Sequence, residues 1–370
     1  MSREGPWRAE TPDPDRRGSV PTPPSPSGPA GSTPDGDRPP APPAPASRSA
    51  AAGAAPRPAG DAPHAPERGR LARLLGPFHV TGVFWFRFHG WGARRPEWLK
   101  RLLLPLFVGF FHLTLRRIRR AIAANLEPVL GPCGPLERER RIWRTLHSRA
   151  WSLTERYERL ETDLPFEVEV DDRAVWERLA GGDRGLLLVT GHVGNWELAS
   201  ALPASEEGRA IHVVREEELD PRAQRFVAGR LAAMGPGYTT HFAAGDPLLG
   251  LTLREALERG EIVALQGDRP RSGGGTVQAR LFGRRYALPV GPLALARQAG
   301  VPLLPAFVYR LGRRRYRVMF DEPVVVARTR DRERDVAEGA RVLAGVLERA
   351  VRRDPYQWYV FREVWGRVAE

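Results

Sequence analysis

The sequence has very little cysteine, very little lysine and no long apolar run. Cys133 stands alone, so an internal disulfide and a cysteine-based zinc site are both excluded, which fits a reducing cytoplasm. Lys100 is the only lysine, so nearly all of the positive charge belongs to arginine, whose guanidinium suits phosphate and carboxylate partners. A membrane-spanning helix needs about 20 apolar residues. The apolar run over residues 102–111 is shorter than that and contains Pro105 and Gly109.

Several functional signatures are also missing. The histidines lie scattered without the spacing of metal ligands, so no metal site is expected. The glycines at 273–275 are not followed by the Lys-Ser/Thr pair of a phosphate-binding loop. The chain shows no recognised nucleic-acid-binding module, and its first residues lack the apolar core of a signal peptide. We therefore expect neither a metal cofactor nor a nucleic-acid partner.

Composition divides the chain into an arm and a folded part. Residues 1–68 are dominated by Pro, Ala, Gly and Ser, a composition that cannot bury enough apolar surface to fold, and we expect a disordered arm there. That arm has balanced charges, so the formal charge of +13 belongs to the rest of the chain. The 42% of hydrophobic residues suffice for a core. The basic, folded part favours anionic partners: a membrane surface, an acidic carrier protein or a phosphorylated lipid.

Residues 69–130 are expected to form a membrane-associated helical segment. Aromatic residues crowd its first part, and the apolar run over 102–111 is flanked by cations on both sides. These flanking residues are Arg94, Arg95, Lys100, Arg101, Arg116, Arg117, Arg119 and Arg120. Cations at both ends favour a helix lying in an anionic membrane interface over one that crosses the bilayer. The alternative is a core helix packed under the catalytic domain.

Residues 131–370 are expected to form a catalytic domain of the α/β class. After two amphipathic helices over 118–130 and 137–160, short apolar strands alternate with helical segments, which predicts a mostly parallel central sheet flanked by helices. Strands are expected over 166–170, 186–189, 210–214, 238–242, 262–265, 303–309, 316–320 and 323–326. Helices are expected over 174–179, after Trp196, and over 222–234, 248–257, 289–298 and 336–351.

The chain is organised around the motif Gly191-His192-Val193-Gly194-Asn195-Trp196-Glu197. It follows the buried-strand pattern of residues 186–189 and precedes a helix, so it lies on a strand-to-helix turn, where α/β folds place their chemistry. A carboxylate at Glu197 can orient the His192 imidazole and raise its basicity. The motif holds no serine or cysteine, so we expect His192 to activate an alcohol or water directly. The alternative is a capped helix whose histidine satisfies a backbone carbonyl.

The motif resembles the His-x4-Asp/Glu block of bacterial lipid A late acyltransferases and related lysophospholipid-type acyltransferases. Further blocks follow in the order of that family, which makes the resemblance over residues 71–366 far more specific than one motif. They are Val213-Val214-Arg215, Gly267-Asp268-Arg269-Pro270, Ala279-Arg280-Leu281-Phe282-Gly283, residues 291–306 and Pro355-Tyr356-Gln357-Trp358-Tyr359. Three departures stand out: Phe361-Arg362-Glu363 replaces a His-Arg pair, residues 272–276 form a flexible loop, and the arm is foreign to the family.

The resemblance implies transfer of a fatty acyl chain from an acyl carrier protein or coenzyme A thioester, with no separate cofactor. The acceptor would be a hydroxyl of a lipid A precursor or related glycolipid, and the enzyme would work at the cytoplasmic face of the plasma (inner) membrane. His192 would be the general base and Glu197 its orienting partner. Arg215 would bind the acceptor phosphate or the developing oxyanion, and Asp268 would orient Arg215 or cap a turn. Further substrate contacts are expected from Arg280, Phe282, Gly283 and Arg284, with Phe282 lining the acyl groove or belonging to the core.

Other functions remain open from the sequence. The acceptor could be a lysophospholipid or a phosphoinositide mannoside. A thioesterase-like hydrolase would use the same motif to activate water, and a non-enzymatic basic protein would only bind membranes or nucleic acid. Thioester turnover without a lipid acceptor would identify the hydrolase, and a dispensable His192 would identify the binding protein.

Overall fold

We describe a computed structural model of the chain over residues 83–162, 164–196, 209–216, 224–225, 237–242, 246–270 and 274–365, and without the side chains of residues 83–86. The expected arm lies outside these residues, as do Glu197, the helix after it and most of the helix expected over 222–234. The chain divides into two units, Met1–Ala65 and Pro66–Glu370, and all of the described residues belong to the second.

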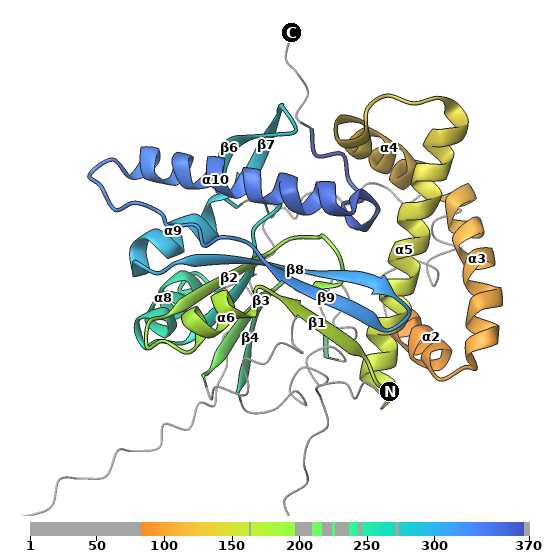
Figure 1. The fold of residues 1–370 in the computed structure, drawn as a ribbon, viewed down its shortest axis with the longest axis horizontal. Coiled ribbons are helices and arrows are strands. Elements are labelled where there is room, and N and C mark those ends of the chain that lie inside the picture. The colour runs from red at the N-terminus through yellow and green to blue at the C-terminus, as the bar shows by residue number, and fades with distance from the viewer. Residues whose placement is uncertain are drawn as a thin grey trace, which may run out of the picture. The chain divides into compact units, whose positions relative to one another are not determined.

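A seven-stranded sheet forms the centre of this unit, in the order β1-β9-β8-β2-β5-β3-β4 (Figure 1). All neighbours are parallel except β8 and β9. The strands are β1 (Glu167–Asp171), β2 (Leu186–Thr190), β3 (Ile211–Arg215), β4 (Tyr238–Phe242), β5 (Ile262–Gln266), β8 (Leu303–Gly312) and β9 (Arg315–Phe320). The sequence prediction of a mostly parallel sheet is confirmed.

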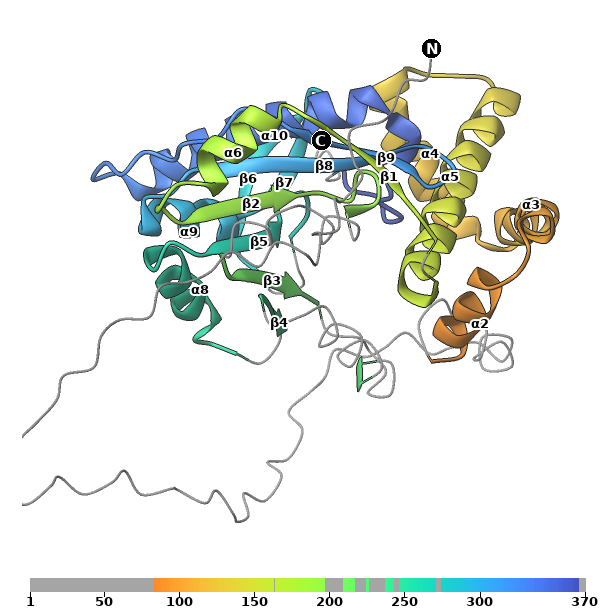
Figure 2. The same cartoon turned by 60° about the horizontal axis from the view of Figure 1, so that its bottom comes forward.

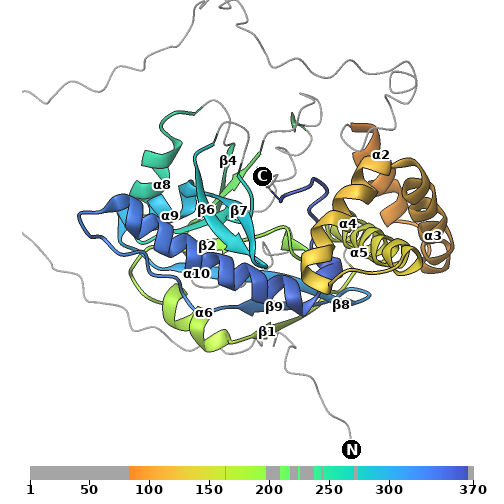
Figure 3. The ribbon, with the colours of Figure 1, turned by 90° about the horizontal axis from the view of Figure 1, so that it is seen from above.

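Helices cover both faces of the sheet, and the central strand β2 shows why. Leu187 and Val189 pack into a core with α8 (Leu249–Glu258), α9 (Val290–Ala299) and α10 (Arg332–Arg353). Leu186 and Leu188 point the other way, into a core with α6 (Arg173–Ala180). Alternate side chains of a strand face opposite sides, so four consecutive aliphatic residues need cover on both. Figure 3 shows α10 and α6 on opposite sides of β8 and β9.

Two parts of the region over residues 131–370 differ from the sequence prediction. A hairpin of β6 (Thr276–Leu281) and β7 (Arg284–Pro289) packs against α10, where no strand was expected. The prediction of a strand over 323–326 is wrong: within this range only Val324 pairs, in an isolated bridge with Leu303. Pro323 has no N–H to donate and Val325 is exposed, so the pairing does not extend.

The helices that precede the sheet pack together as one layer, beside the end of β8 and β9 (Figure 2). They are α2 (Val83–Ala93), α3 (Glu97–Thr114), α4 (Arg116–Leu130) and the long α5 (Pro135–Glu161). Among the described residues, no single helix has the length and apolar composition to cross a membrane. Helices α3 and α4, which meet at 91°, satisfy these two criteria only when they are taken together as a pair.

Helix α3 has one exposed apolar face and one face turned to α5. Trp98, Leu102, Leu103, Leu106, Phe110 and Leu113 are exposed. Phe107 is half-buried and stacks on Phe88, and Lys100 is buried with its ammonium bound to Glu158 and to the carbonyl of Ala93. The expectation that Lys100 serves as a surface cation beside the apolar run is therefore wrong, because its charge is neutralised inside the helical layer.

Candidate active site

His192 and Asp268 meet at the carboxyl ends of the neighbouring parallel strands β2 and β5. The His192 ring Nδ1 lies 2.9 Å from Asp268 Oδ1, and the His192 main-chain N–H donates to Asp268 Oδ2 over 2.8 Å. The two strand ends approach closely at Gly267, whose N–H donates to the carbonyl of Thr190 over 2.8 Å. A Cβ on Gly267 would lie 2.4 Å from a Val189 methyl, so glycine is required for this approach.

The Asp268 carboxyl group is buried and ionised. Burial opposes its ionisation, but the charge and hydrogen bonds of His192, together with the charge of Arg269, outweigh that effect and hold the pKa of Asp268 below its ordinary value. A carboxylate can only accept, so Nδ1 of His192 carries the proton of this contact, and in the neutral imidazole the lone pair is therefore on Nε2. The imidazole is thereby prepared to take a proton at Nε2.

The turn that carries His192 is held by the end of the chain. Tyr359 N–H donates to the His192 carbonyl over 2.7 Å, and Gly194 N–H donates to the Gln357 carbonyl over 2.8 Å. Gly194 has a φ of +69°, and a Cβ there would lie 2.0 Å from the Val308 carbonyl oxygen. The Pro355–Tyr359 block, which begins with the 3₁₀ helix η4 (Pro355–Gln357), therefore holds the turn that carries His192, a role that its sequence alone does not indicate.

A hydrogen bond from the β6–β7 hairpin holds Asp268 in place. The hydroxyl of Tyr286, on β7, donates to the main-chain carbonyl of Asp268 over 2.5 Å. Burial, reinforced by the Asp268 charge, raises the pKa of Tyr286 far above its ordinary value, so the phenol stays protonated and remains a donor.

Trp196 lies in contact range of both His192 and Arg215. The ring centroids of His192 and Trp196 are 6.4 Å apart, and the Arg215 guanidinium carbon is 5.4 Å from the Trp196 ring. Arg215 ends β3, which pairs with β5, so the arginine lies at the same edge of the sheet as the His192–Asp268 pair. The structure thus brings together His192, Asp268 and Arg215.

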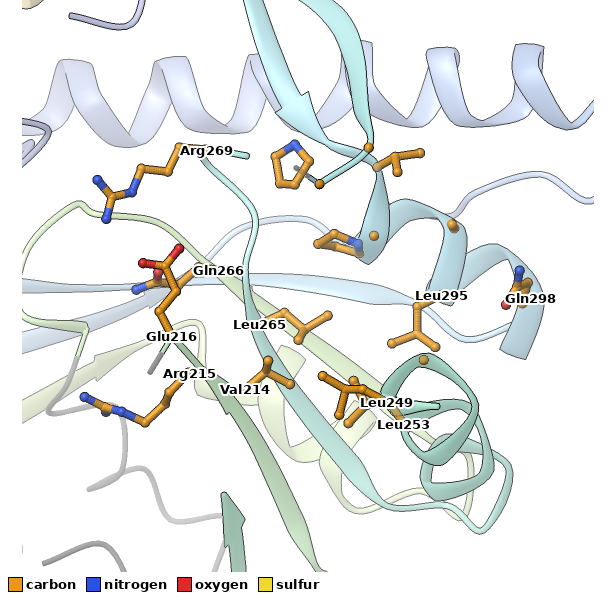
Figure 4. Close-up of a pocket in the computed structure, with 18 residues that line it drawn as sticks. Val214, Arg215, Glu216, Leu249, Leu253, Leu265, Gln266, Arg269, Leu295 and Gln298 are labelled. Atoms are coloured by element: carbon orange, nitrogen blue, oxygen red, sulfur yellow. The ribbon is translucent and has the colours of Figure 1, made fainter. Parts of the chain in front are cut away.

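A pocket of about 410 Å³ opens at this edge (Figure 4). Arg215, Glu216, Gln266 and Arg269 gather at one end, and leucines of β5, α8 and α9 gather at the other. The leucines are Leu249, Leu253, Leu265 and Leu295. Gln266 and Arg269 flank the Gly267-Asp268 pair in sequence, so the polar end of the pocket lies beside the Asp268 turn. A pocket with one apolar end and one charged end suits an amphipathic ligand.

The remaining predicted substrate residues lie on the β6–β7 hairpin, and none of them is among the residues that line this pocket. Arg280 donates to the Gly283 carbonyl over 3.1 Å, and the Arg284 guanidinium lies 5.9 Å from the Trp365 ring. Phe282 is half-buried with φ at +50°; its N–H donates to Glu348 and its ring faces Trp358 and Arg352. The structure places Phe282 against α10 and the end of the chain.

The structure also shows what sequence reasoning missed in this site. Asp268 was expected beside Arg215 or in a turn cap, whereas its carboxylate contacts His192. Glu197, the predicted partner of His192, lies outside the described residues. A signal was available, because Gly267-Asp268 follows an apolar strand just as Gly191-His192 does. Carboxyl ends of neighbouring parallel strands meet at one edge.

Comparison with known proteins finds a family whose sequence model spans this site. The sequence model of the family described as bacterial lipid A biosynthesis acyltransferase matches residues 98–367. Two relatives, both named phosphatidylinositol mannoside acyltransferase, come from the H37Rv and CDC 1551 strains of Mycobacterium tuberculosis. Each is 27% identical over 244 residues, which cover 63% of this chain and 74% of the relative. The family match includes both strand ends that carry the His192–Asp268 pair.

Proposed function

The chain belongs to the bacterial lipid A biosynthesis acyltransferase family and is an acyl-transferring enzyme, and from this we propose that it moves a fatty acyl chain from a thioester to a glycolipid hydroxyl, with His192 as the general base. The donor is acyl carrier protein or coenzyme A carrying the chain. The observation that carries the proposal is the His192–Asp268 pair beside an amphipathic pocket.

The proposed reaction proceeds by direct attack. His192 Nε2 accepts the proton of the acceptor hydroxyl as its oxygen attacks the thioester carbonyl carbon. The carbon–sulfur bond then breaks, and the thiolate leaves with the proton that His192 returns. Asp268 holds Nδ1–H throughout and stabilises the imidazolium that forms in between. Arg215 supplies a fixed positive charge for the acceptor phosphate or for the developing oxyanion.

The pocket gives the substrates their places in this proposal. Its leucine end takes the hydrocarbon chain, because burying methylene groups there removes them from water. Its polar end, with Arg215 and Arg269, takes the thioester and the anionic part of the acceptor. The names of the two relatives favour a phosphatidylinositol mannoside as acceptor, and the family description favours a lipid A precursor as the second candidate.

The exposed apolar face of α3 supports work at a membrane surface, which we place at the cytoplasmic side of the plasma membrane because both donors are cytoplasmic thioesters. Arg94 and Arg95 lie just before α3, and Arg116 and Arg117 lie just after it; all four are exposed. Apolar insertion combined with arginine attraction to anionic lipid is the pattern of an interfacial helix.

Lipid analysis tests the reaction. A strain lacking the gene should accumulate a glycolipid lighter by one acyl chain, and the wild-type protein should restore it while His192→Ala should not. An assay of purified enzyme with a thioester and lipid vesicles then distinguishes the acceptors, because it measures acyl transfer to the mannoside, to the lipid A precursor or to neither. Thioester consumption that does not depend on an acceptor would identify a hydrolase instead. A folded His192→Ala protein with normal transfer would remove the proposed base.

The membrane surface has its own test. Replacing Leu102, Leu106 and Phe110 by serine should abolish binding to anionic vesicles, since these side chains are exposed and do not support the core. Phe107 is left in place because it packs against Phe88. A matched variant with serine at Leu136, Leu248 and Leu311, exposed leucines on other elements, should bind normally. Equal vesicle binding by both folded variants would place the membrane contact elsewhere.

A further inference from the structure

A buried asparagine lies three residues beyond the proposed base and is not used by the chemistry. Asn195 is 1% exposed, and its Nδ2 donates to the Ser152 carbonyl over 3.1 Å and to the Tyr316 hydroxyl oxygen over 3.2 Å. A main-chain carbonyl can only accept, so the amide nitrogen must face Ser152 and the orientation of the side chain is fixed. Asn195 therefore ties the catalytic turn to α5 on one side and to β9 on the other.

The Tyr316 hydroxyl is committed to this contact by its second partner. Tyr316 is fully buried on β9, and its O–H donates to the Glu155 carboxylate of α5. Glu155 also accepts from Arg310 over 2.8 Å and from Arg313 over 3.1 Å, so it is a fixed, charge-balanced acceptor. Because the Tyr316 O–H donates its hydrogen bond to Glu155, the oxygen of that hydroxyl can accept the hydrogen bond from Asn195. Burial and the Glu155 charge raise the pKa of Tyr316, so the phenol stays neutral and keeps both roles.

We propose that Tyr316 is a positioning residue for acyl transfer, which holds Asn195 and thereby keeps the His192 ring aligned with Asp268. This inference rests on the proposed role of His192 as the base. It makes α5 a functional support of the active site, because Glu155 and the Ser152 carbonyl complete the chain of hydrogen bonds. If Tyr316 served only to fill the core, its ring would suffice and its hydroxyl would have no effect on the reaction.

The decisive variant is Tyr316→Phe, which removes the hydroxyl and keeps the ring. Tyr309→Phe is a matched control: Tyr309 lies on the adjacent strand β8, is also buried, and its hydroxyl donates to the Ala350 carbonyl on α10 over 2.9 Å. Both variants lose one buried hydroxyl, and Tyr316→Phe should lower the melting temperature more because its hydroxyl also donates to a carboxylate, so kcat is compared well below both melting temperatures. For Tyr316→Phe we expect kcat to fall roughly tenfold, equivalent to about 1.4 kcal/mol, with the KM of donor and acceptor within about twofold of wild type. The kcat of Tyr309→Phe should stay normal.

A double-mutant cycle tests whether the effect passes through Asn195. If it does, Tyr316→Phe combined with Asn195→Ala should be no slower than Asn195→Ala alone, while Tyr309→Phe should show no coupling to Asn195→Ala. Equal kcat for the folded Tyr316 and Tyr309 variants, or additive losses in the cycle, would overturn the proposal. Should Tyr316→Phe fail to fold, the folded Asn195→Ala variant decides: a lower kcat at constant KM supports positioning, and an unchanged kcat refutes it.

The same assays separate this inference from the proposed function. If wild-type protein transfers no acyl chain, or if folded His192→Ala remains active, the proposed function or its base has failed. If wild type and His192→Ala behave as expected while Tyr316→Phe matches Tyr309→Phe, only the positioning role has failed.

Discussion

Replacing Asp268 by asparagine tests the proposed mechanism most directly, because it exchanges a single oxygen at the centre of the site for an NH2 group. In Asp268→Asn the amide oxygen can still accept from the His192 main-chain N–H. The amide nitrogen takes the place of the oxygen that lies 2.9 Å from Nδ1, and it can only donate. Donation from this nitrogen to Nδ1 favours the tautomer whose proton is on Nε2, where the base needs a lone pair, over the remaining 3.1 Å contact between Nδ1 and the retained oxygen.

The size of the effect follows from the geometry. A hydrogen bond to a charged group contributes about 1.5–3 kcal/mol, so its loss from the imidazolium alone lowers kcat roughly 10- to 150-fold. The wrong tautomer adds to this, as in serine protease triads, where the same amide replacement lowers kcat by about 10⁴-fold. We therefore expect kcat to fall about 10³- to 10⁴-fold, with the KM of the donor little changed.

The assay follows labelled acyl chain from a thioester into acceptor glycolipid in anionic vesicles, with circular dichroism and thermal melting as folding controls. Glu197→Gln is the comparison, since Glu197 is the partner that the motif suggests. It should lose less than Asp268→Asn. A folded Asp268→Asn enzyme that keeps more than about a tenth of the wild-type kcat, beside an inactive Glu197→Gln, would give the orienting role to Glu197 and refute the reasoning.

Three further predictions address the pocket and the helical layer. Arg215→Lys keeps the charge but loses bidentate hydrogen bonding, so the acceptor KM should rise or kcat should fall about tenfold; unchanged steady-state constants would remove Arg215 from the site. Leu249→Trp should fill the leucine end of the pocket and shorten the preferred acyl chain, at about 0.8 kcal/mol or roughly fourfold per displaced methylene. Leu248→Trp, at the exposed neighbouring residue, should leave the preferred chain length unchanged. Mass spectrometry of the acylated product measures the chain length in both variants. Burial, with the charges of Arg149 and Arg156, lowers the pKa of His89 from 6.5 to about 4. As the pH falls, His89 is therefore protonated in the unfolded chain before it is protonated in the folded one. The free energy of unfolding keeps its full value well above pH 6.5 and falls as the pH drops toward 4, by on the order of 2 kcal/mol at pH 5. His89→Phe should remove that part of the acid sensitivity from melting curves recorded between pH 7 and 5.

The local elements of the fold could be read from the sequence, because they depend on periodicity and composition. The four aliphatic residues of β2 predicted a strand buried on both faces, and the alternation of strands and helices predicted the parallel sheet. The β6–β7 hairpin was missed because its Phe282–Gly283 turn and exposed arginines resemble a loop, and its stability comes from packing on α10.

The sequence by itself also determined the reaction class, through the order of its motifs, and the end of the sheet where His192 lies. Only the tertiary structure decided which carboxylate meets the Nδ1 of His192, which residues brace its turn, and that Lys100 is buried. Glu197 is five residues from His192 and Asp268 is 76, yet Asp268 is in contact because β2 and β5 are hydrogen-bonded neighbours in the sheet. Sequence separation says little about distance across a parallel sheet, since strand order is set by how the helices pack on both faces.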